Sequence, residues 1–328
     1  MAKKPELHLD AAISAPEATI PAATAGVVDF STLSAQVTRL AAQLSKTEGQ
    51  LERLERLATD VRNLVGPVGI PMPDGQMLVQ TVYGVKFLID PSDLIMAPNL
   101  IIYRQWEPDI SSYFWSSFNA NTVFVDVGAN LGYFTCLGAS RIGRSGRGRV
   151  FAVEPNPNCL KLLDRNLIIN WSMSPVDVFR GAVGDHEARA VLAVPRNRAA
   201  NASLSVGVER LDDTELVDVA LKPLDTILPN DLVVDFMKID VEGHEFAALS
   251  GATSVIRRSP NIKIVMEWSP PQMSDAGYPA TQMVELLRGL GLRAFRMGDA
   301  AALAAGTATP LDWFAMTDLG YDNLILTY

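Results

Sequence analysis

Short apolar runs alternate with segments of helical periodicity from Thr122 to the C-terminus, and this alternation limits the possible folds more than any other feature. Strands that are buried on both faces appear as continuous apolar runs, and the helices between them supply the crossovers of a parallel sheet. The pattern therefore predicts an α/β fold with a doubly wound sheet whose last strand is antiparallel. The predicted strands are 123–127, 150–153, 176–183, 232–239, 262–267, 292–297 and 323–328.

Two segments precede this region and differ in composition. Residues 1–30 are rich in Ala, Pro and Thr and lack periodicity, so we expect a flexible tail. Residues 31–65 predict a coiled-coil oligomerisation helix roughly 50 Å long, with a dimer favoured over a trimer. The alternative is an amphipathic helix that packs on the chain's own globular domain. The residues spaced alternately by four and three are Leu33, Val37, Leu40, Leu44, Thr47, Leu51, Leu54, Ala58, Val61 and Val65.

Gly and Pro residues from Gly66 to Pro73 end the predicted helix and mark a boundary. Residues 66–121 are predicted to form a cap, with a hairpin over 77–89 and a short helix over 109–118. The main domain is then 122–328. Within it, the segments 188–194 and 217–221 predict a hairpin inserted between the third and fourth strands.

Composition and charge exclude several classes of protein. The chain has 328 residues with 28 Lys and Arg against 37 Asp and Glu, a net charge of -9, so we do not expect a nucleic-acid partner. Cys136 and Cys159 lack the spacing of a metal or redox motif, which favours buried free thiols in a reducing compartment. No apolar run is long enough for a membrane span, and charges and Pro5 interrupt any signal-peptide core. We therefore predict a cytoplasmic protein.

The strongest local motif runs from the strand at 123–127 through a turn into a helix. Asp126 lies at the strand end, and Gly128, Asn130 and Gly132 follow in the turn. Ligands of open α/β sheets bind at such strand ends, and glycine lets the backbone approach a ligand closely. An acid and an Asn in this turn disfavour a pyrophosphate but suit a cationic amino-acid group. Glu154 ends the next strand, where a carboxylate can accept bonds from ribose hydroxyls.

Further acids follow the later strands. Asp185 follows the third strand, where it is either a contact for an adenine amino group or a turn residue. Asp240, Glu242 and His244 crowd the end of the fourth strand, and Glu267 ends the fifth. This density of ionisable residues predicts a reaction centre. For Glu245, compensation of the helix dipole is favoured over a functional role.

Taken together, these motifs resemble the ordered motif series of FkbM-type methyltransferases. The matching segments are 126–132, 154–156, 182–185, 224–225 and 238–244, and the likeness covers roughly 83–328. The resemblance implies a Rossmann-like class I fold over 122–328, with S-adenosylmethionine as cofactor. It also implies methylation of an oxygen of a sugar or polyketide, with a small-molecule or glycan acceptor. The predicted coiled coil lies outside the resemblance.

Methyl transfer to a hydroxyl needs a group that accepts the hydroxyl proton. His244 is our first choice as base because its ordinary pKa lies near neutral pH. Asp240 would orient His244 or the acceptor, while Glu242 and Glu267 remain candidate bases or orienting groups. The same acids could bind Mg²⁺, but no metal is required by the resemblance. The alternative functions are an NAD- or nucleotide-sugar-dependent oxidoreductase, which lacks its G-x-G-x-x-G motif here, and a non-catalytic coiled-coil assembly protein.

Overall fold

The computed structural model describes residues 30–65, 69–143, 145–173, 175–195, 203–204 and 214–328. Residues 1–29 of the predicted tail lie outside this description. The chain divides into two compact units, Met1–Val61 and Arg62–Tyr328. Helix α1 (Phe30–Val65) is continuous over 36 residues, in agreement with the predicted helix, while its assembly into a coiled coil stays a prediction. Among the described residues, no helix combines the length and apolar character that a membrane span requires.

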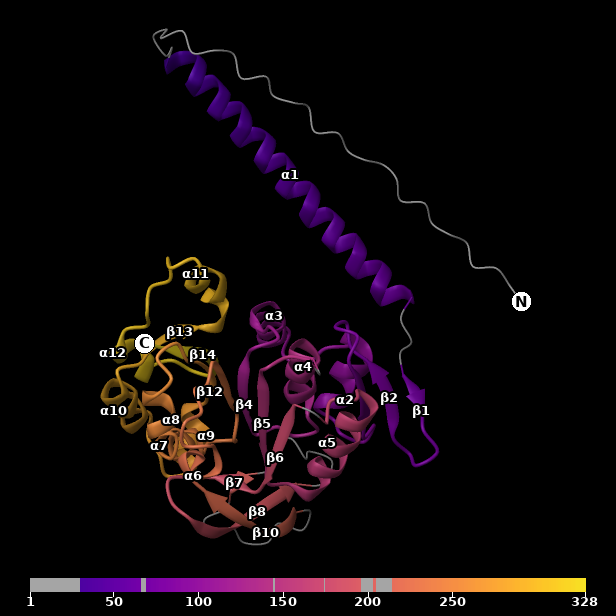
Figure 1. The fold of residues 1–328 in the computed structure, drawn as a ribbon, viewed down its shortest axis with the longest axis vertical. Helices are drawn as coiled ribbons and strands as arrows, with labels where there is room; N and C mark the ends of the chain where they lie inside the picture. The colour runs from indigo at the N-terminus through magenta and orange to yellow at the C-terminus, as the bar shows by residue number, and fades with distance from the viewer. Residues whose placement is uncertain (1–29, 66–68, 144, 174, 196–202, 205–213) are drawn as a thin grey trace, which may run out of the picture. The chain divides into compact units, whose positions relative to one another are not determined.

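A seven-stranded sheet forms the centre of the second unit (Figure 1). Its strand order is β13-β14-β12-β11-β4-β5-β6, with β14 antiparallel to both neighbours and the other pairs parallel. The predicted doubly wound α/β sheet with an antiparallel last strand is therefore confirmed. The strands are β4 (Val123–Val127), β5 (Arg149–Glu154), β6 (Val176–Arg180), β11 (Phe236–Ile239), β12 (Lys263–Trp268), β13 (Arg293–Arg296) and β14 (Asp322–Thr327).

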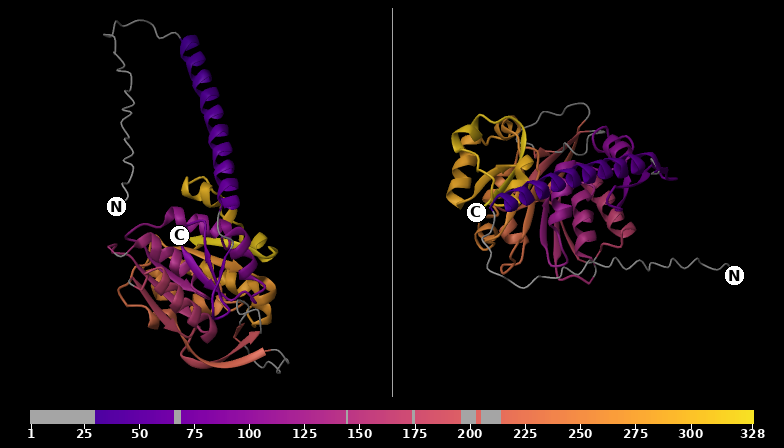
Figure 2. Two further views of the ribbon diagram at one scale, coloured as in Figure 1. Left: turned by 90° about the vertical axis from the view of Figure 1, so that its right-hand side faces the viewer. Right: turned by 90° about the horizontal axis from the view of Figure 1, so that it is seen from above.

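Alternate residues of the central strands belong to two different cores. On β4, Phe124 packs in one core, and Val125 and Val127 pack in the other. Two layers of helices cover these cores, and Figure 2 shows the sheet between them. The first core includes residues of α3 (Pro108–Ser117), α4 (Tyr133–Ile142) and α5 (Pro157–Ile169); the second includes residues of α7 (Glu245–Ser250), α8 (Thr253–Arg257) and α10 (Ala280–Leu290).

The segment before β4 packs directly on the main sheet's helices. Its antiparallel strands include the predicted hairpin, β2 paired with β3. Asn166 of α5 accepts a bond from the Leu88 amide at 2.7 Å and donates to the Leu131 carbonyl at 2.8 Å. One buried amide thus ties this segment to the turn after β4. Its elements are β1 (Ile70–Pro71), β2 (Met77–Gln80), β3 (Lys86–Ile89), α2 (Met96–Pro98), the π-helix η1 (Asn99–Tyr103) and α3.

A second, smaller sheet has the order β7-β10-β8-β9 and contains the predicted inserted hairpin, in which β8 and β10 are antiparallel. The strand predicted at 176–183 is divided between the two sheets at Gly181, which lies between β6 and β7. The strands are β7 (Ala182–Val183), β8 (Ala188–Pro195), β9 (Ser203–Leu204) and β10 (Thr214–Lys222). The remaining elements are α6 (Leu224–Ile227), α9 (Pro270–Asp275), the 3-10 helix η3 (Met297–Asp299), α11 (Ala300–Ala304) and α12 (Trp313–Thr317).

Candidate active site

A cavity of about 420 Å³ lies at the carboxyl ends of β4, β5 and β11. The strand order reverses between β4 and β11, and an open α/β sheet binds its ligand at such a switch point. All four residues of the predicted reaction centre line this cavity together with three of the predicted cofactor residues. These lining residues are Asp240, Glu242, His244, Glu267, Gly128, Asn130 and Glu154.

The turn after β4 is shaped by contacts within the chain. Gly128 has φ +83°, and a Cβ atom at this position would lie 1.9 Å from the Asp240 carbonyl oxygen. The structure requires this glycine for the close approach of the segment after β11, and its predicted role in letting a ligand approach stays a prediction. Asn130 also has positive φ, at 53°, a conformation that Asn tolerates better than most residues.

Glu154 is buried and holds two backbone segments at the cavity wall. Its Oε2 accepts a bond from the Asn130 amide, and its Oε1 accepts one from the Asn156 amide, both at 2.7 Å. Burial raises the pKa of Glu154 to about 7, and these two backbone hydrogen bonds oppose that shift. Each carboxylate oxygen keeps a second lone pair, so the side chain can also accept bonds from a ligand.

Three predicted cofactor residues are not among the cavity-lining residues. Asp126 is buried beneath the turn, where its Oδ2 accepts a bond from the Thr135 hydroxyl at 2.5 Å. Gly132 is the N-cap of α4, with φ +89°. Asp185 is exposed and pairs with His186 at 2.6 Å. A contact between Asp185 and adenine therefore stays a prediction.

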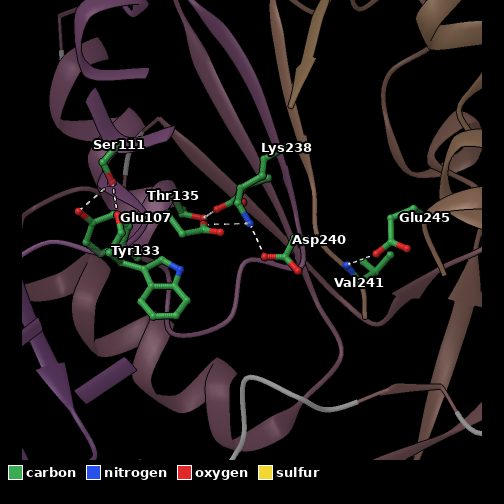
Figure 3. Close-up of polar contacts among 10 residues, drawn as sticks. Glu107, Ser111, Tyr133, Thr135, Lys238, Asp240, Val241 and Glu245 are labelled. Carbon is green, nitrogen blue, oxygen red and sulfur yellow. Dashed lines mark hydrogen bonds and ion pairs between the residues drawn. The ribbon is translucent and has the colours of Figure 1, made fainter. Parts of the chain in front are cut away.

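Lys238 is a buried cation on β11, beside the cavity (Figure 3). Its ammonium lies 2.6 Å from Asp240 Oδ2 and 3.8 Å from Glu107 Oε2. Burial alone would lower the pKa of Lys238, but the carboxylates of Asp240, Glu107 and Asp126 hold it above its ordinary value. Lys238 therefore stays charged and joins the sheet to the segment before α3.

His244 and Glu242 lie on the turn between β11 and α7. Glu242 has φ +53°, and its Oε2 accepts a bond from the side-chain amide Nε2 of Gln272 at 2.5 Å. The Nδ1 atom of His244 is buried and has no hydrogen-bond partner among the described residues. Burial lowers the pKa of His244, so that its neutral form, the form that can accept a proton, dominates at neutral pH.

Two acids, one directly after the motif at 238–244 and one in the motif at 224–225, organise the backbone. Glu245 is fully buried, and its Oε1 accepts bonds from the amides of Val241 and Gly243 at 3.1 and 3.2 Å. Asp225 accepts bonds from the amides of Ser254 and Val255, both at 2.8 Å, and so caps α8. Neither residue lines the cavity, which agrees with the non-functional interpretation of Glu245.

Sequence reasoning missed several lining residues that come from distant segments. Glu107 lies in the cap segment, 131 positions before Lys238, and burial raises its pKa to about 7. Tyr321 lies just before β14 and is hydrogen bonded to Glu267, whose pKa burial raises to about 8. Trp106 and Gln272 complete this set. None of them was among the predicted site residues, and Trp106 and Glu107 lie just before the helix that the sequence predicted over 109–118.

A family model for the methyltransferase FkbM domain matches residues 126–294, slightly more than half of the chain. The chain belongs to the FkbM methyltransferase family. It is also 25% identical over 217 residues to methyltransferase sdnD of Sordaria araneosa, which covers 55% of this chain and 82% of that protein. The predicted family is thereby confirmed, and the oxidoreductase alternative is replaced by a methyltransferase.

Solved structures of methyltransferases are also similar. An FkbM methyltransferase from Methylobacillus flagellatus is 18% identical with a TM-score of 0.39, and the match covers 64% of this chain and 44% of that one. The TYW2 protein of M. jannaschii, solved in complex with AdoMet, is 14% identical with a TM-score of 0.37. That match covers 77% of this chain and 84% of the other. The present methyltransferase thus spans less than half the length of the Methylobacillus chain.

The cofactor of this methyltransferase is S-adenosylmethionine, and the cavity suits its charge. Five acids, Glu107, Glu154, Asp240, Glu242 and Glu267, line the cavity, whereas Lys238 supplies the positive charge among the described lining residues. The Oε2 atoms of Glu107 and Glu267 are buried and have no hydrogen-bond partner in the described part of the chain. A wall with more carboxyl groups than cations fits the positive charge of a sulfonium and an ammonium group.

Proposed function

We propose that this methyltransferase transfers the methyl group of S-adenosylmethionine to a hydroxyl oxygen of a carbohydrate, a glycan or a similar natural product. S-adenosylmethionine supplies an electrophilic methyl carbon on a positively charged sulfur. The chain's own residues have to hold the acceptor oxygen in line with that carbon and to take up its proton.

The observation that carries this proposal is the division of one cavity into two walls. Gly128, Asn130 and Glu154 follow β4 and β5 and form the wall proposed to hold the cofactor. The acids and His244 follow β11 and β12 and form the wall proposed to face the acceptor. Trp106 and Tyr321 add aromatic surface to the same cavity. Carboxylates can accept hydrogen bonds from hydroxyl groups. Together with the neighbouring aromatic rings they form a surface that suits a hydroxylated acceptor.

His244 is the proposed base. As the acceptor oxygen forms its bond to the methyl carbon, the carbon–sulfur bond breaks and its electron pair stays on sulfur. The hydroxyl proton passes to the unpartnered Nδ1 atom of His244. Because His244 is neutral at neutral pH, it has a free lone pair for this proton.

Glu242 and Glu267 remain the alternative bases. The described residues contain no group of three or more His, Cys, Asp or Glu side chains arranged to hold a metal ion. Glu267, whose pKa burial raises to about 8, would be largely protonated at pH 7 and so less able to accept a proton. Glu242 is then the stronger competitor to His244.

The test is a mass-spectrometric screen for methylated products from candidate acceptors, with isotopically labelled cofactor. On a verified acceptor, His244→Ala should lower turnover about 10²- to 10⁴-fold with little change in cofactor affinity. His186→Ala is the matched control, because His186 is exposed and outside the cavity. If Glu242→Gln lowers turnover by that amount and His244→Ala does not lower it, Glu242 is the base. Products methylated only on nitrogen or carbon would overturn the proposal.

We also propose that α1 mediates self-association, in keeping with its heptad spacing. Removal of residues 1–65 should then reduce the mass measured by light scattering and leave cofactor binding intact. Equal numbers of chains per particle in the two proteins would instead favour the alternative, an amphipathic helix that packs on the chain's own globular domain. The cytoplasmic location stays a prediction from sequence.

A further inference from the structure

A stripe of apolar side chains on α1 is exposed along the described part of the helix. Val37, Leu40, Leu44, Leu51 and Leu54 are each more than half exposed. A stripe of this length is costly to leave in water, and a helix with the same heptad spacing can bury it along its whole length. The chain itself supplies such a partner in a second copy.

We propose that this stripe is the interface of a parallel two-stranded coiled coil between two copies of the chain. The inference rests on the self-association proposed above and adds its orientation and number of strands. In heptad terms, Val37, Leu44, Leu51 and Ala58 occupy the a positions, and Leu40, Thr47 and Leu54 occupy the d positions. The d positions hold Leu apart from Thr47, while the a positions mix Leu with Val37 and Ala58. This combination is closer to the two-stranded pattern than to one with Ile at both positions, which favours trimers.

The polar residue in this interface carries no unsatisfied donor. Thr47 donates its hydroxyl hydrogen to the Gln43 carbonyl of its own helix at 2.9 Å. A buried hydroxyl without a partner would destabilise the interface, and this internal bond removes that penalty. In a parallel pair, Thr47 meets the partner's Thr47, so both polar side chains share one layer.

The residues that flank the stripe favour the parallel orientation. In a parallel pair, each g position faces the e position of the next heptad in the partner. Gln43 at g then lies opposite the partner's Glu48 at e, and Gln50 lies opposite the partner's Glu55. Each contact joins an amide donor to a carboxylate acceptor and occurs twice by symmetry.

An antiparallel pair would instead bring e positions together. With the helices fully overlapped, Glu48 would lie opposite the partner's Glu48, a like-charge contact in the middle of the interface. Thr47 would also pack against the partner's apolar Leu51. The parallel arrangement avoids both contacts, and it places the C-terminal ends of both helices together. The two methyltransferase domains then begin at the same end of the coil.

Disulfide trapping distinguishes the two orientations. Leu40→Cys places a thiol at a d position that meets itself only in the parallel pair; in the antiparallel pair it meets position 58. Under mild oxidation of the full-length protein, we expect Leu40→Cys alone to form a covalent dimer. The native Cys136 and Cys159 are buried, so the unmodified protein serves as one control. Ala42→Cys is the second control, because its f position points away from the partner in either orientation.

The outcomes separate the orientation from self-association and from the methyltransferase assignment. A covalent dimer that forms only when Leu40→Cys and Ala58→Cys chains are mixed would overturn the parallel orientation. A monomer in light scattering would overturn self-association, and a trimer would overturn the number of strands. Cofactor binding by the same samples shows whether the catalytic domain is intact, independently of all three results.

Discussion

The ammonium of Lys238 lies 2.6 Å from Asp240 Oδ2. Lys238 is near the end of β11, Asp240 directly follows this strand, and both residues line the cavity. Glu107, from the segment before α3, approaches the same ammonium at 3.8 Å. One buried cation therefore offsets acids from two parts of the chain that are distant in sequence. This places the cap segment in the electrostatics of the active site.

Lys238→Met should destabilise the protein strongly. The substitution keeps most of the volume but leaves Asp240 and Glu107 without their cation, and breaking a buried pair in this way costs about 3 to 5 kcal/mol. Denaturant unfolding measures the change. Lys222→Met is the control, because Lys222 pairs with Glu187 on the surface and should cost less than about 1 kcal/mol. Similar values for the two variants would show that the Lys238 cluster is not tightly coupled.

Gly128→Ala should lower both stability and cofactor binding. The new methyl group would meet the Asp240 carbonyl, so the turn after β4 or the segment after β11 has to move. Gly75→Ala is a matched control: its φ is also +83°, but no atom lies within 4 Å of the added methyl. The control carries the backbone strain without the clash. If both variants lose the same stability in thermal unfolding, backbone strain, and not the close approach to Asp240, explains why position 128 requires glycine.

The main sheet was predictable from sequence because its strands are buried on both faces and its acids mark their carboxyl ends. The exceptions have local causes. The run at 176–183 shows no break in its strand pattern that would mark two sheets, but Gly181 lies at the change of sheet, where a Cβ would meet the Ala220 carbonyl oxygen at 2.7 Å. The run at 232–239 begins as a turn, since Asp235 accepts the Val123 amide through its side chain before β11 starts.

The candidate site was predictable only where its residues follow the strands. Asp240, Glu242, His244 and Glu267 could be grouped because parallel strands end at one edge. Glu107 and Tyr321 could not, since their positions depend on how the cap and the last loop fold back on that edge. Asp126 was placed correctly at the strand end, but strand alternation turns its side chain toward Thr135 and away from the cavity wall.

Glu154→Gln should remove most of the thermal stabilisation that S-adenosylmethionine gives. A ligand at 100 times its Kd stabilises the native state by about 2.7 kcal/mol, and loss of the proposed contact with the ribose should reduce that stabilisation. Unlike a substitution by Ala, Gln keeps an oxygen that can accept one of the two backbone bonds now made by Glu154. We therefore expect a modest fall in the melting temperature of the unliganded variant. A full ligand-induced shift in Glu154→Gln would remove this residue from the cofactor site.

The unliganded protein should lose stability as the pH rises from about 5 to 8. Burial raises the pKa of Glu107, Glu154 and Glu245 to about 7 and that of Glu267 to about 8, from an ordinary value of 4.5. Between these limits the folded state holds protons that the unfolded state has released, so the free energy of unfolding falls with pH. Urea unfolding at several pH values measures the slope. Glu267→Gln should flatten it up to pH 8, whereas exposed Glu285→Gln should not.

Stability falls as the pH rises, whereas the preference of the protein for S-adenosylmethionine over S-adenosylhomocysteine should increase. As the cavity acids ionise, the positively charged sulfur of S-adenosylmethionine gains attraction that the neutral sulfur of S-adenosylhomocysteine lacks. The ratio of their dissociation constants should therefore shift toward S-adenosylmethionine between pH 6 and pH 8. A one-unit change in a carboxyl pKa on binding corresponds to up to about a tenfold shift. The ammonium group is common to both ligands, so its own titration largely cancels in the ratio.

Calorimetric titration of both ligands at each pH measures this ratio. Glu267→Gln and Glu107→Gln should each reduce its pH dependence, because each removes an ionising acid from the cavity. Glu285→Gln again serves as the control. If the ratio is constant with pH in the unmodified protein, the acids do not face the sulfur, and the acidic wall would then serve the acceptor alone. If only Glu107→Gln changes the ratio, the cap segment and not β12 supplies the carboxylate beside the sulfur.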